Sequence, residues 1–293
     1  MDVSIIIRTY NEARHLPELL GAIEAQRKDG LLHEVLVVDS GSSDATVEFA
    51  EKGGCRILHI PKESFSFGRS LNLGCRSASG RYLVFVSGHC VPVNDRWLTS
   101  LLRPLIERTV SLVYGRQVGG SESRFSECRI FERHYPATSS VPQEGFFNNN
   151  ANAALLKDVW EQSGFDEELT GLEDLCLGKK LLSLGMKIGY VSEAEVRHMH
   201  DESWGKIRNR FEREALALQH IMPEIHLTRY DFARYLGAGI AHDGTDALRR
   251  GCFLQRLPEI FMYRLMQYWG AYRGNHIHRR LSSVRKERYF YPR

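Results

Sequence analysis

The sequence lacks several features that would place it in a familiar class. It contains no run of about 18 apolar residues, the length a helix needs to cross a bilayer. Its six cysteines form no C-x-x-C pair and no zinc-finger spacing, so we expect reduced thiols in a cytoplasmic protein. No basic stretch precedes the apolar residues 3–7, which we interpret as a strand rather than a secretory signal.

The charge lacks a strong overall bias. A formal net charge of +3, with 26% charged residues, argues against a dedicated nucleic-acid-binding protein, so no nucleic-acid partner is expected. The average hides a local excess, because residues 246–293 hold 11 Arg or Lys and 3 Asp or Glu, a net charge of +8. This basic, apolar segment fits an anionic membrane surface. The alternative is a helix that packs on the catalytic domain or on another subunit with its arginines in solvent, and both interpretations stay open.

The hydrophobic pattern of the first half alternates between two periods. Short runs rich in branched residues, at 3–8, 34–39, 56–60 and 81–86, predict buried strands. Helical patterns at 15–28, 43–52 and 69–78 lie between them, which indicates an α/β fold with a mostly parallel sheet flanked by helices. From residue 203 the pattern is mostly helical. We therefore predict a catalytic domain over 1–202 and a helical C-terminal region over 203–293, basic from about 246.

The turn after the first predicted strand has no glycine-rich loop. It reads Thr9-Tyr10-Asn11-Glu12, which excludes the G-x-G-x-x-G fingerprint of dinucleotide-binding enzymes, and the chain also lacks a P-loop. The second strand ends in Asp39-Ser40-Gly41, where a carboxylate can accept hydrogen bonds from a base or ribose and glycine allows close backbone approach. Asp44, further along this turn, could simply cap the next helix.

Four motifs, in this order, carry a resemblance. They are Thr9-Tyr10-Asn11-Glu12, Val37-Val38-Asp39-Ser40-Gly41-Ser42-Ser43-Asp44, Gly164-Phe165-Asp166-Glu167 and Gly171-Leu172-Glu173-Asp174. Together they resemble family 2 glycosyltransferases of the GT-A fold over roughly residues 3–200. The segment 113–117, with Tyr135-Pro136 downstream, is further similar to the bacterial rhamnosyltransferase-like branch.

The resemblance implies an inverting transfer of a sugar from a nucleotide-sugar donor to a glycan or lipid-linked acceptor in surface polysaccharide biosynthesis. It implies that Asp174, beside Glu173, is the catalytic base, although a first-turn acidic pair is also what the helix dipole favours. The remaining residues at donor-binding positions of the family are Thr9, Tyr10, Asn11, Glu12, Asp39, Ser40, Gly41, Asn72, Ser87 and Gly88.

The family pattern breaks at the end of the fourth predicted strand. Where the family has Asp-x-Asp, this chain has Ser87-Gly88-His89, and neither end is anionic. Three accounts compete. His89 could ligate a divalent cation, Mn²⁺ or Mg²⁺, with His198 and His200. Arginines such as Arg69 or Arg116 could instead neutralise the diphosphate without a metal. In the third account the chain is a non-catalytic glycan- or nucleotide-binding subunit.

Residues 146–153 form an amide-rich stretch. The resemblance implies that this stretch lies on the acceptor side of the pocket. Asn150 and Asn152 are candidate acceptor-binding residues because an amide both donates to and accepts from sugar hydroxyls. The alternative is turn chemistry, since Asn tolerates left-handed backbone. Trp204 could cover the acceptor or pack on the core. A lipid-linked acceptor would place the protein on the inner face of the cell membrane.

Overall fold

The computed structural model describes residues 1–200, 202–276 and 289–290. The chain forms two compact units. The first comprises Met1–Gly120, Tyr135–Glu168 and Glu173–Met199, and the second comprises Ser121–His134, Leu169–Leu172 and His200–Arg293. The functional division into 1–202 and 203–293 stays a prediction.

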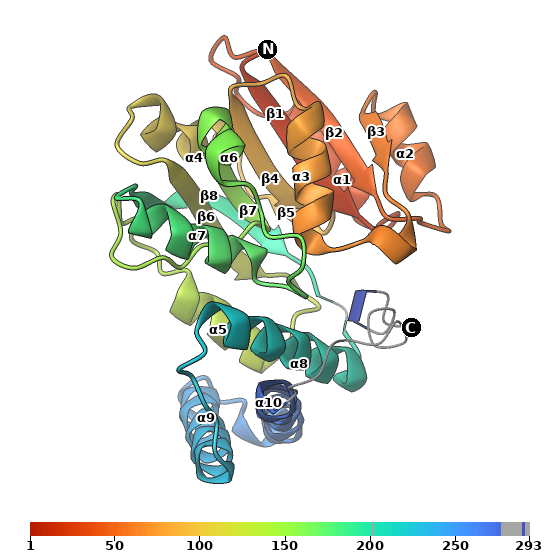
Figure 1. Cartoon of the computed structure of the whole chain (residues 1–293). Helices are drawn as coiled ribbons and strands as arrows, with labels where there is room; N and C mark the ends of the chain where they lie inside the picture. The colour runs from red at the N-terminus through yellow and green to blue at the C-terminus, as the bar shows by residue number, and fades with distance from the viewer. Residues whose placement is uncertain (201, 277–288, 291–293) are drawn as a thin grey trace. The chain divides into compact units, whose positions relative to one another are not determined.

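The first unit is built on an eight-stranded sheet with the order β3-β2-β1-β4-β7-β6-β8-β5 (Figure 1). Only β7 and β5 run antiparallel to their neighbours, so the predicted α/β fold with a mostly parallel sheet is confirmed. The strands are β1 (Val3–Thr9), β2 (His33–Asp39), β3 (Arg56–His59), β4 (Tyr82–Ser87), β5 (Cys90–Pro92), β6 (Leu112–Gly119), β7 (Asn152–Leu156) and β8 (Ile188–His198).

Alternation along β1 divides its side chains between two cores. Ile5 and Ile7 belong to a hydrophobic core together with Leu19 of α1 (Leu16–Glu24) and Trp97 of α4 (Trp97–Ile106). Ile6 points to the other face, where Gly74 of α3 (Phe67–Ser77) lies close to its methyl groups. Helices therefore cover both faces, as parallel sheets require. The remaining helices of this unit are α2 (Thr46–Lys52), the 3₁₀ turn η1 (Lys62–Ser64), α6 (Lys157–Ser163) and α7 (Glu173–Ser183).

Strand direction determines where polar side chains gather. β1, β2, β4, β6 and β8 all run the same way, so their carboxyl ends lie at one edge of the sheet. β5 returns from that edge antiparallel to β8 and pairs Cys90 with His198. Ligands of such sheets bind at this edge.

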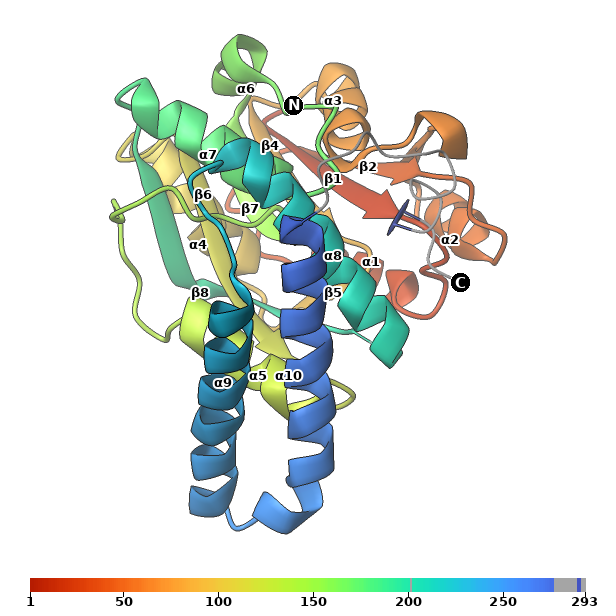
Figure 2. The ribbon, with the colours of Figure 1, turned by 60° about the horizontal axis from the view of Figure 1, so that its bottom comes forward.

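The second unit is helical in its described part. It contains α5 (Phe125–His134), α8 (Trp204–Ile221), α9 (Arg229–Arg249) and α10 (Phe253–Asn275). Figure 2 shows α9 and α10 side by side, and a buried bidentate ion pair between Asp243 and Arg264 joins them, with N–O distances of 2.7 and 2.8 Å. α8 packs against Gly270 and Gly274 of α10, where a Cβ atom would collide with the α8 backbone. No helix among the described residues is long and apolar enough to cross a membrane.

Candidate active site

The turns that follow β1 and β2 bind each other at the carboxyl edge of the sheet. The Asp39 carboxylate is 1% exposed and accepts hydrogen bonds from the backbone N–H groups of Gly41 and Ser42, at 2.9 and 3.0 Å. Gly41 has φ +85°, a left-handed conformation that favours glycine. The Ser40 hydroxyl donates to the Thr9 carbonyl at 3.1 Å, and the Thr9 hydroxyl donates to Asp39 at 3.3 Å. Hydrogen bonds therefore connect the predicted base-binding residues of the two turns.

Asn11 and Tyr10 complete this pair of turns. Asn11 has φ +55°, and its amide oxygen accepts from the Ser43 backbone N–H at 2.8 Å. The Lys62 ammonium group lies 4.9 Å from the centre of the Tyr10 ring, close enough for a cation–π contact. Asp44 accepts hydrogen bonds from Ala13 and Thr46, so it joins the two turns as well as preceding α2.

The Asn72 side chain joins α3 to the loop after α6. Its nitrogen donates to the Phe165 carbonyl and to Glu167, both at 2.9 Å, and its oxygen accepts from Trp160 and from the Phe165 N–H. These four hydrogen bonds engage both ends of the amide inside the first unit. Contact between Asn72 and a donor stays a prediction.

The turn after β4 places His89 beside Glu12. The His89 Nδ1 atom lies 2.6 Å from Glu12 Oε1, and Gly88 makes this approach possible because a Cβ at Gly88 would lie 2.9 Å from Glu12 Cγ. The backbone N–H of Ser87 donates to the Ala151 carbonyl, which links β4 to the start of β7. Ser87-Gly88-His89, the segment that breaks the family pattern, is therefore held by these contacts at the carboxyl ends of the strands.

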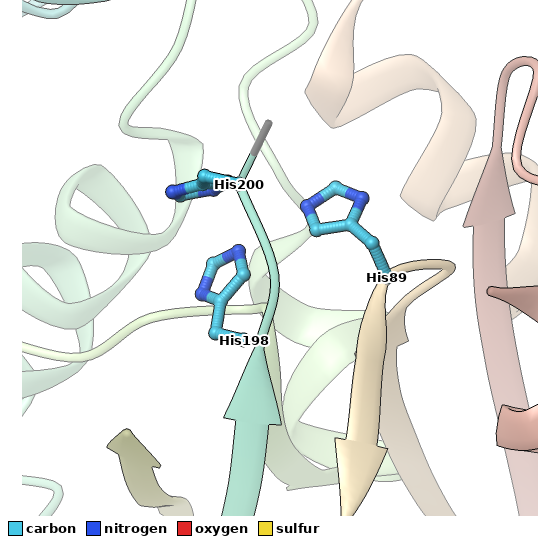
Figure 3. Close-up of side chains that lie close together, drawn as sticks. All are labelled: His89, His198 and His200. Carbon is cyan, nitrogen blue, oxygen red and sulfur yellow. The ribbon is translucent and has the colours of Figure 1, made fainter. Parts of the chain in front are cut away.

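Two of the three predicted metal ligands lie together in the first unit. The His89 and His198 rings stack with centroids 5.0 Å apart, and their ligand atoms lie within 4.8 Å of one another (Figure 3). His198 Nδ1 lies 2.7 Å from Gln117 Oε1. His200, two residues further along the chain, belongs to the second unit, where its Nδ1 lies 2.8 Å from Glu127 and Arg210 donates to the same carboxylate.

The acidic pair Glu173-Asp174 opens α7 and is almost completely buried. Arg8, at the carboxyl end of β1, lies 3.3 Å from Glu173 Oε1. The Asp174 carboxylate accepts from the backbone N–H groups of Asn150 and Leu175, at 3.1 and 2.7 Å. Burial, followed by the negative charge of Glu173, raises the pKa of Asp174 to about 7. A carboxyl group with this pKa is suited to general base catalysis near neutral pH.

The predicted acceptor-binding residues have different surroundings. Asn150 bridges the acidic pair, because its side-chain nitrogen lies 3.5 Å from Glu173 while its backbone binds Asp174. Asn152 has no exposed surface, and its amide is bonded to Trp97, Arg116 and Ala194, so its contact with an acceptor stays a prediction that the geometry does not support. Trp204 begins α8 in the second unit, with the Arg124 guanidinium 3.8 Å above its ring.

Two side chains of this site were not among the predicted residues. Arg8 pairs with Glu173, and the signal that could have found it is the one charged residue in the otherwise uncharged strand β1. Gln117 binds His198, and no local signal identifies it because the contact depends on the pairing of β6 with β8.

Comparison with known proteins places this geometry in a family. A family model described as Glycosyl transferase family 2 matches residues 4–162. The chain is 25% identical over 262 residues to the O-antigen chain rhamnosyltransferase RfbN of Salmonella typhimurium, which spans 85% of this chain and 75% of that protein. It is 36% identical over 206 residues to the glycosyltransferase AglE of Haloferax volcanii, which spans 65% of this chain and 64% of that protein.

Solved structures show the same fold. The mannosyltransferase PcManGT from Pyrobaculum calidifontis, in complex with GDP-Man and Mn²⁺, superposes with a TM-score of 0.62 at 18% identity and covers 92% of this chain and 85% of its own. The glucosyl-3-phosphoglycerate synthase of Mycobacterium tuberculosis superposes with a TM-score of 0.55 at 19% identity, covering 75% and 79%. The predicted GT-A-type architecture is confirmed.

Proposed function

The chain belongs to glycosyl transferase family 2, and we propose that it transfers a sugar, with inversion, from a nucleotide-sugar donor to a glycan or lipid-linked acceptor of a surface polysaccharide. The O-antigen rhamnosyltransferases among its relatives support a role in polysaccharide biosynthesis. They also agree with the resemblance to the rhamnosyltransferase-like branch. The donor's base and ribose are proposed to bind the paired turns after β1 and β2, with Thr9, Tyr10, Asn11, Glu12, Asp39, Ser40, Gly41, Asn72, Ser87 and Gly88 as the donor-site residues.

The observation that carries this proposal is the buried carboxyl of Asp174. In an inverting displacement the acceptor hydroxyl attacks the anomeric carbon as the bond from that carbon to the diphosphate oxygen breaks. Asp174 takes the hydroxyl proton, and its pKa of about 7 leaves much of it ionised at neutral pH. Glu173 and Asp174 place two carboxyl groups side by side in a buried site. Arg8 balances the charge of Glu173. Asn150 binds both carboxyls and so fixes their mutual position.

A divalent cation is the proposed cofactor, held by His89 and His198 of the first unit; a role for His200 as a third ligand stays a prediction. The donor set fits such an ion, because imidazole nitrogens suit Mn²⁺ better than Mg²⁺, which prefers oxygen ligands. When bound, the cation would neutralise charge that develops on the departing diphosphate. Full activity in excess EDTA would contradict the metal requirement. It would favour the alternative in which arginines such as Arg69 or Arg116 neutralise the diphosphate.

We also propose that the second unit contacts the inner face of the membrane, where a lipid-linked acceptor resides. Six of the thirteen large apolar side chains exposed among the described residues lie on α9 and α10, and the exposed arginines of these two helices, Arg229, Arg234 and Arg249, lie on α9. Aromatic side chains mixed with arginines suit an anionic lipid surface. Part of the basic segment 246–293, namely 277–288 and 291–293, lies outside the described residues. The six exposed apolar side chains on α9 and α10 are Tyr230, Tyr235, Leu248, Leu254, Phe261 and Trp269.

Vesicle flotation tests the membrane contact. The full chain should float with vesicles that contain about 30% phosphatidylglycerol, an anionic lipid, and less with neutral ones, because each basic residue near such a surface contributes about 1 kcal/mol. A variant with Leu254→Ser and Trp269→Ser should float less. Leu184→Ser, at an exposed apolar side chain of the first unit, is the matched control. Equal flotation of all three proteins would exclude contact through α10.

The activity itself is tested by incubation with a panel of nucleotide-sugars and extracted lipid-linked acceptor. We expect one donor to release its nucleoside diphosphate and the sugar to appear in the product with inverted configuration. If no donor is consumed, the non-catalytic binding subunit becomes the better account, and direct binding of nucleoside diphosphates would then support it.

A further inference from the structure

The two histidines at the end of β4 and β8 share a feature that the family resemblance does not explain. Each has its Nδ1 atom within 2.7 Å of a side-chain oxygen, which belongs to Glu12 for His89 and to Gln117 for His198. A metal-ligating histidine needs its other ring nitrogen fixed in this way, because that partner sets the tautomer and the orientation of the ring.

The partner of His89 determines its tautomer directly. An ionised carboxylate has no proton to donate, so a hydrogen bond between Glu12 Oε1 and His89 Nδ1 requires the proton on Nδ1. In the neutral ring, Nε2 then carries the lone pair. The contact is made possible by Gly88, since any side chain there would meet Glu12.

The tautomer of His198 follows from a chain of three hydrogen bonds. The backbone N–H of Ala151 donates to the Asn149 side chain at 3.0 Å, so that atom of Asn149 is the oxygen. The Asn149 oxygen also faces the Gln117 amide at 3.1 Å, and so receives its NH₂ group. Gln117 consequently presents its oxygen to His198, which donates from Nδ1 at 2.7 Å. Gln117 is 1% exposed, so burial keeps the amide in this orientation.

We propose that Glu12 and Gln117 are positioning residues that hold His89 and His198 with Nε2 ready for a divalent cation, and that Glu12 supplies through His89 the negative charge that an aspartate would carry in the missing Asp-x-Asp motif. This rests on the proposed function, since the cation would serve the same donor site. Of the two, only Glu12 adds a charge to a neutral pair of ligands.

Ring-nitrogen NMR of the metal-free full chain tests the tautomers. The protein is labelled with ¹⁵N-histidine and studied at pH 8, and His89→Asn and His198→Asn assign the two rings. We expect both rings with the proton on Nδ1. Gln117→Leu should change the His198 signal and leave His89 as it was, and Glu12→Ala should do the reverse. A proton on Nε2 in either wild-type ring would overturn the proposal.

Titration with Mn²⁺ alone, followed by the electron paramagnetic resonance of the free ion, tests the consequence. Loss of a residue that orients a metal ligand weakens affinity about 10–100-fold. We expect losses of this size for Glu12→Ala and Gln117→Leu, and a smaller loss for Glu12→Gln, which keeps an acceptor oxygen and removes the charge. Glu48→Gln, an exposed carboxylate of the same unit bonded to Lys52, should bind like the wild type.

The outcomes separate this inference from the proposed function. If the wild type binds Mn²⁺ and the three variants bind it equally well, the positioning role is wrong while the transferase remains. If the wild type binds no Mn²⁺, the inference is likewise wrong, and donor turnover in EDTA then reports on the transferase by itself.

Discussion

Glu173→Gln tests whether the acidic pair works as a coupled unit. The side chain keeps its shape and loses the negative charge that, after burial, most raises the pKa of Asp174. Because burial remains, the pKa should fall only part of the way toward the usual aspartate value. The base form of Asp174 would then persist at lower pH than in the wild type.

The expected fall in pKa follows from the geometry. Asn150 contacts both carboxyls, so the two charges lie close together. Two like charges about 6 Å apart repel by about 3 kcal/mol at an effective dielectric constant of about 20. That energy corresponds to a pKa change of about 2, since a change of one in pKa equals about 1.4 kcal/mol. Arg8, 3.3 Å from Glu173, offsets part of this repulsion, so we expect the pKa of Asp174 to fall by about 1 in the variant.

The assay is the pH dependence of kcat/KM, normalised to its plateau, for the donor that the panel identifies. Activity of the wild type should fall as the pH drops through about 7, because Asp174 becomes protonated. At about pH 6 roughly a tenth of the wild type and half of the variant should hold the ionised base, a relative gain of about fivefold. Glu48→Gln is the control. An acid limb that stays in place or moves to higher pH in Glu173→Gln would refute the reasoning.

Three further predictions concern stability and the cofactor. The pKa of Asp174 is raised in the folded protein, so its contribution to stability is present at low pH and is lost as the pH rises through about 7. Asp174→Asn should therefore raise the melting temperature at pH 8, with a free-energy gain of at most about 4 kcal/mol, because folding raises the pKa of this carboxyl from 3.8 to about 7. Asn72→Ala leaves the Trp160 and Phe165 N–H groups without their acceptor and should cost about 2–5 kcal/mol in urea unfolding; a change below about 1 kcal/mol would contradict its structural role. EDTA should slow transfer, and added Mn²⁺ should restore it better than Mg²⁺ does; equal rescue by both ions would argue against histidine ligands.

The elements that could be predicted from the sequence are those determined by local pattern. The apolar runs at 3–8, 34–39 and 81–86 form β1, β2 and β4 to within a residue or so, because buried parallel strands need branched side chains on both faces. The polar turns at their ends lie at one edge of the sheet, as the strand direction requires. The acidic pair likewise begins a helix, α7.

The parts that could not be predicted depend on contacts between distant segments. No local sequence pattern indicates that β7 runs antiparallel to β4. Nor does any local pattern indicate that the Asn152 amide forms hydrogen bonds with Trp97, Arg116 and Ala194. The resemblance predicts Asn72 as a donor-site residue, and in the structure its amide forms hydrogen bonds with the loop after α6. Glu12 and His89 are 77 positions apart in the sequence, so their contact becomes visible only when the two turns are brought together.

The most direct measurement of the central claim is the turnover of Asp174→Asn with the identified donor and acceptor. Loss of a general base costs about 10²–10⁴-fold in kcat, so the variant should bind the donor with nearly unchanged affinity and transfer the sugar at least about a hundredfold more slowly. Its raised thermal stability at pH 8 would show that the loss is chemical. A variant that turns over at the wild-type rate would contradict the assignment of Asp174 as the base.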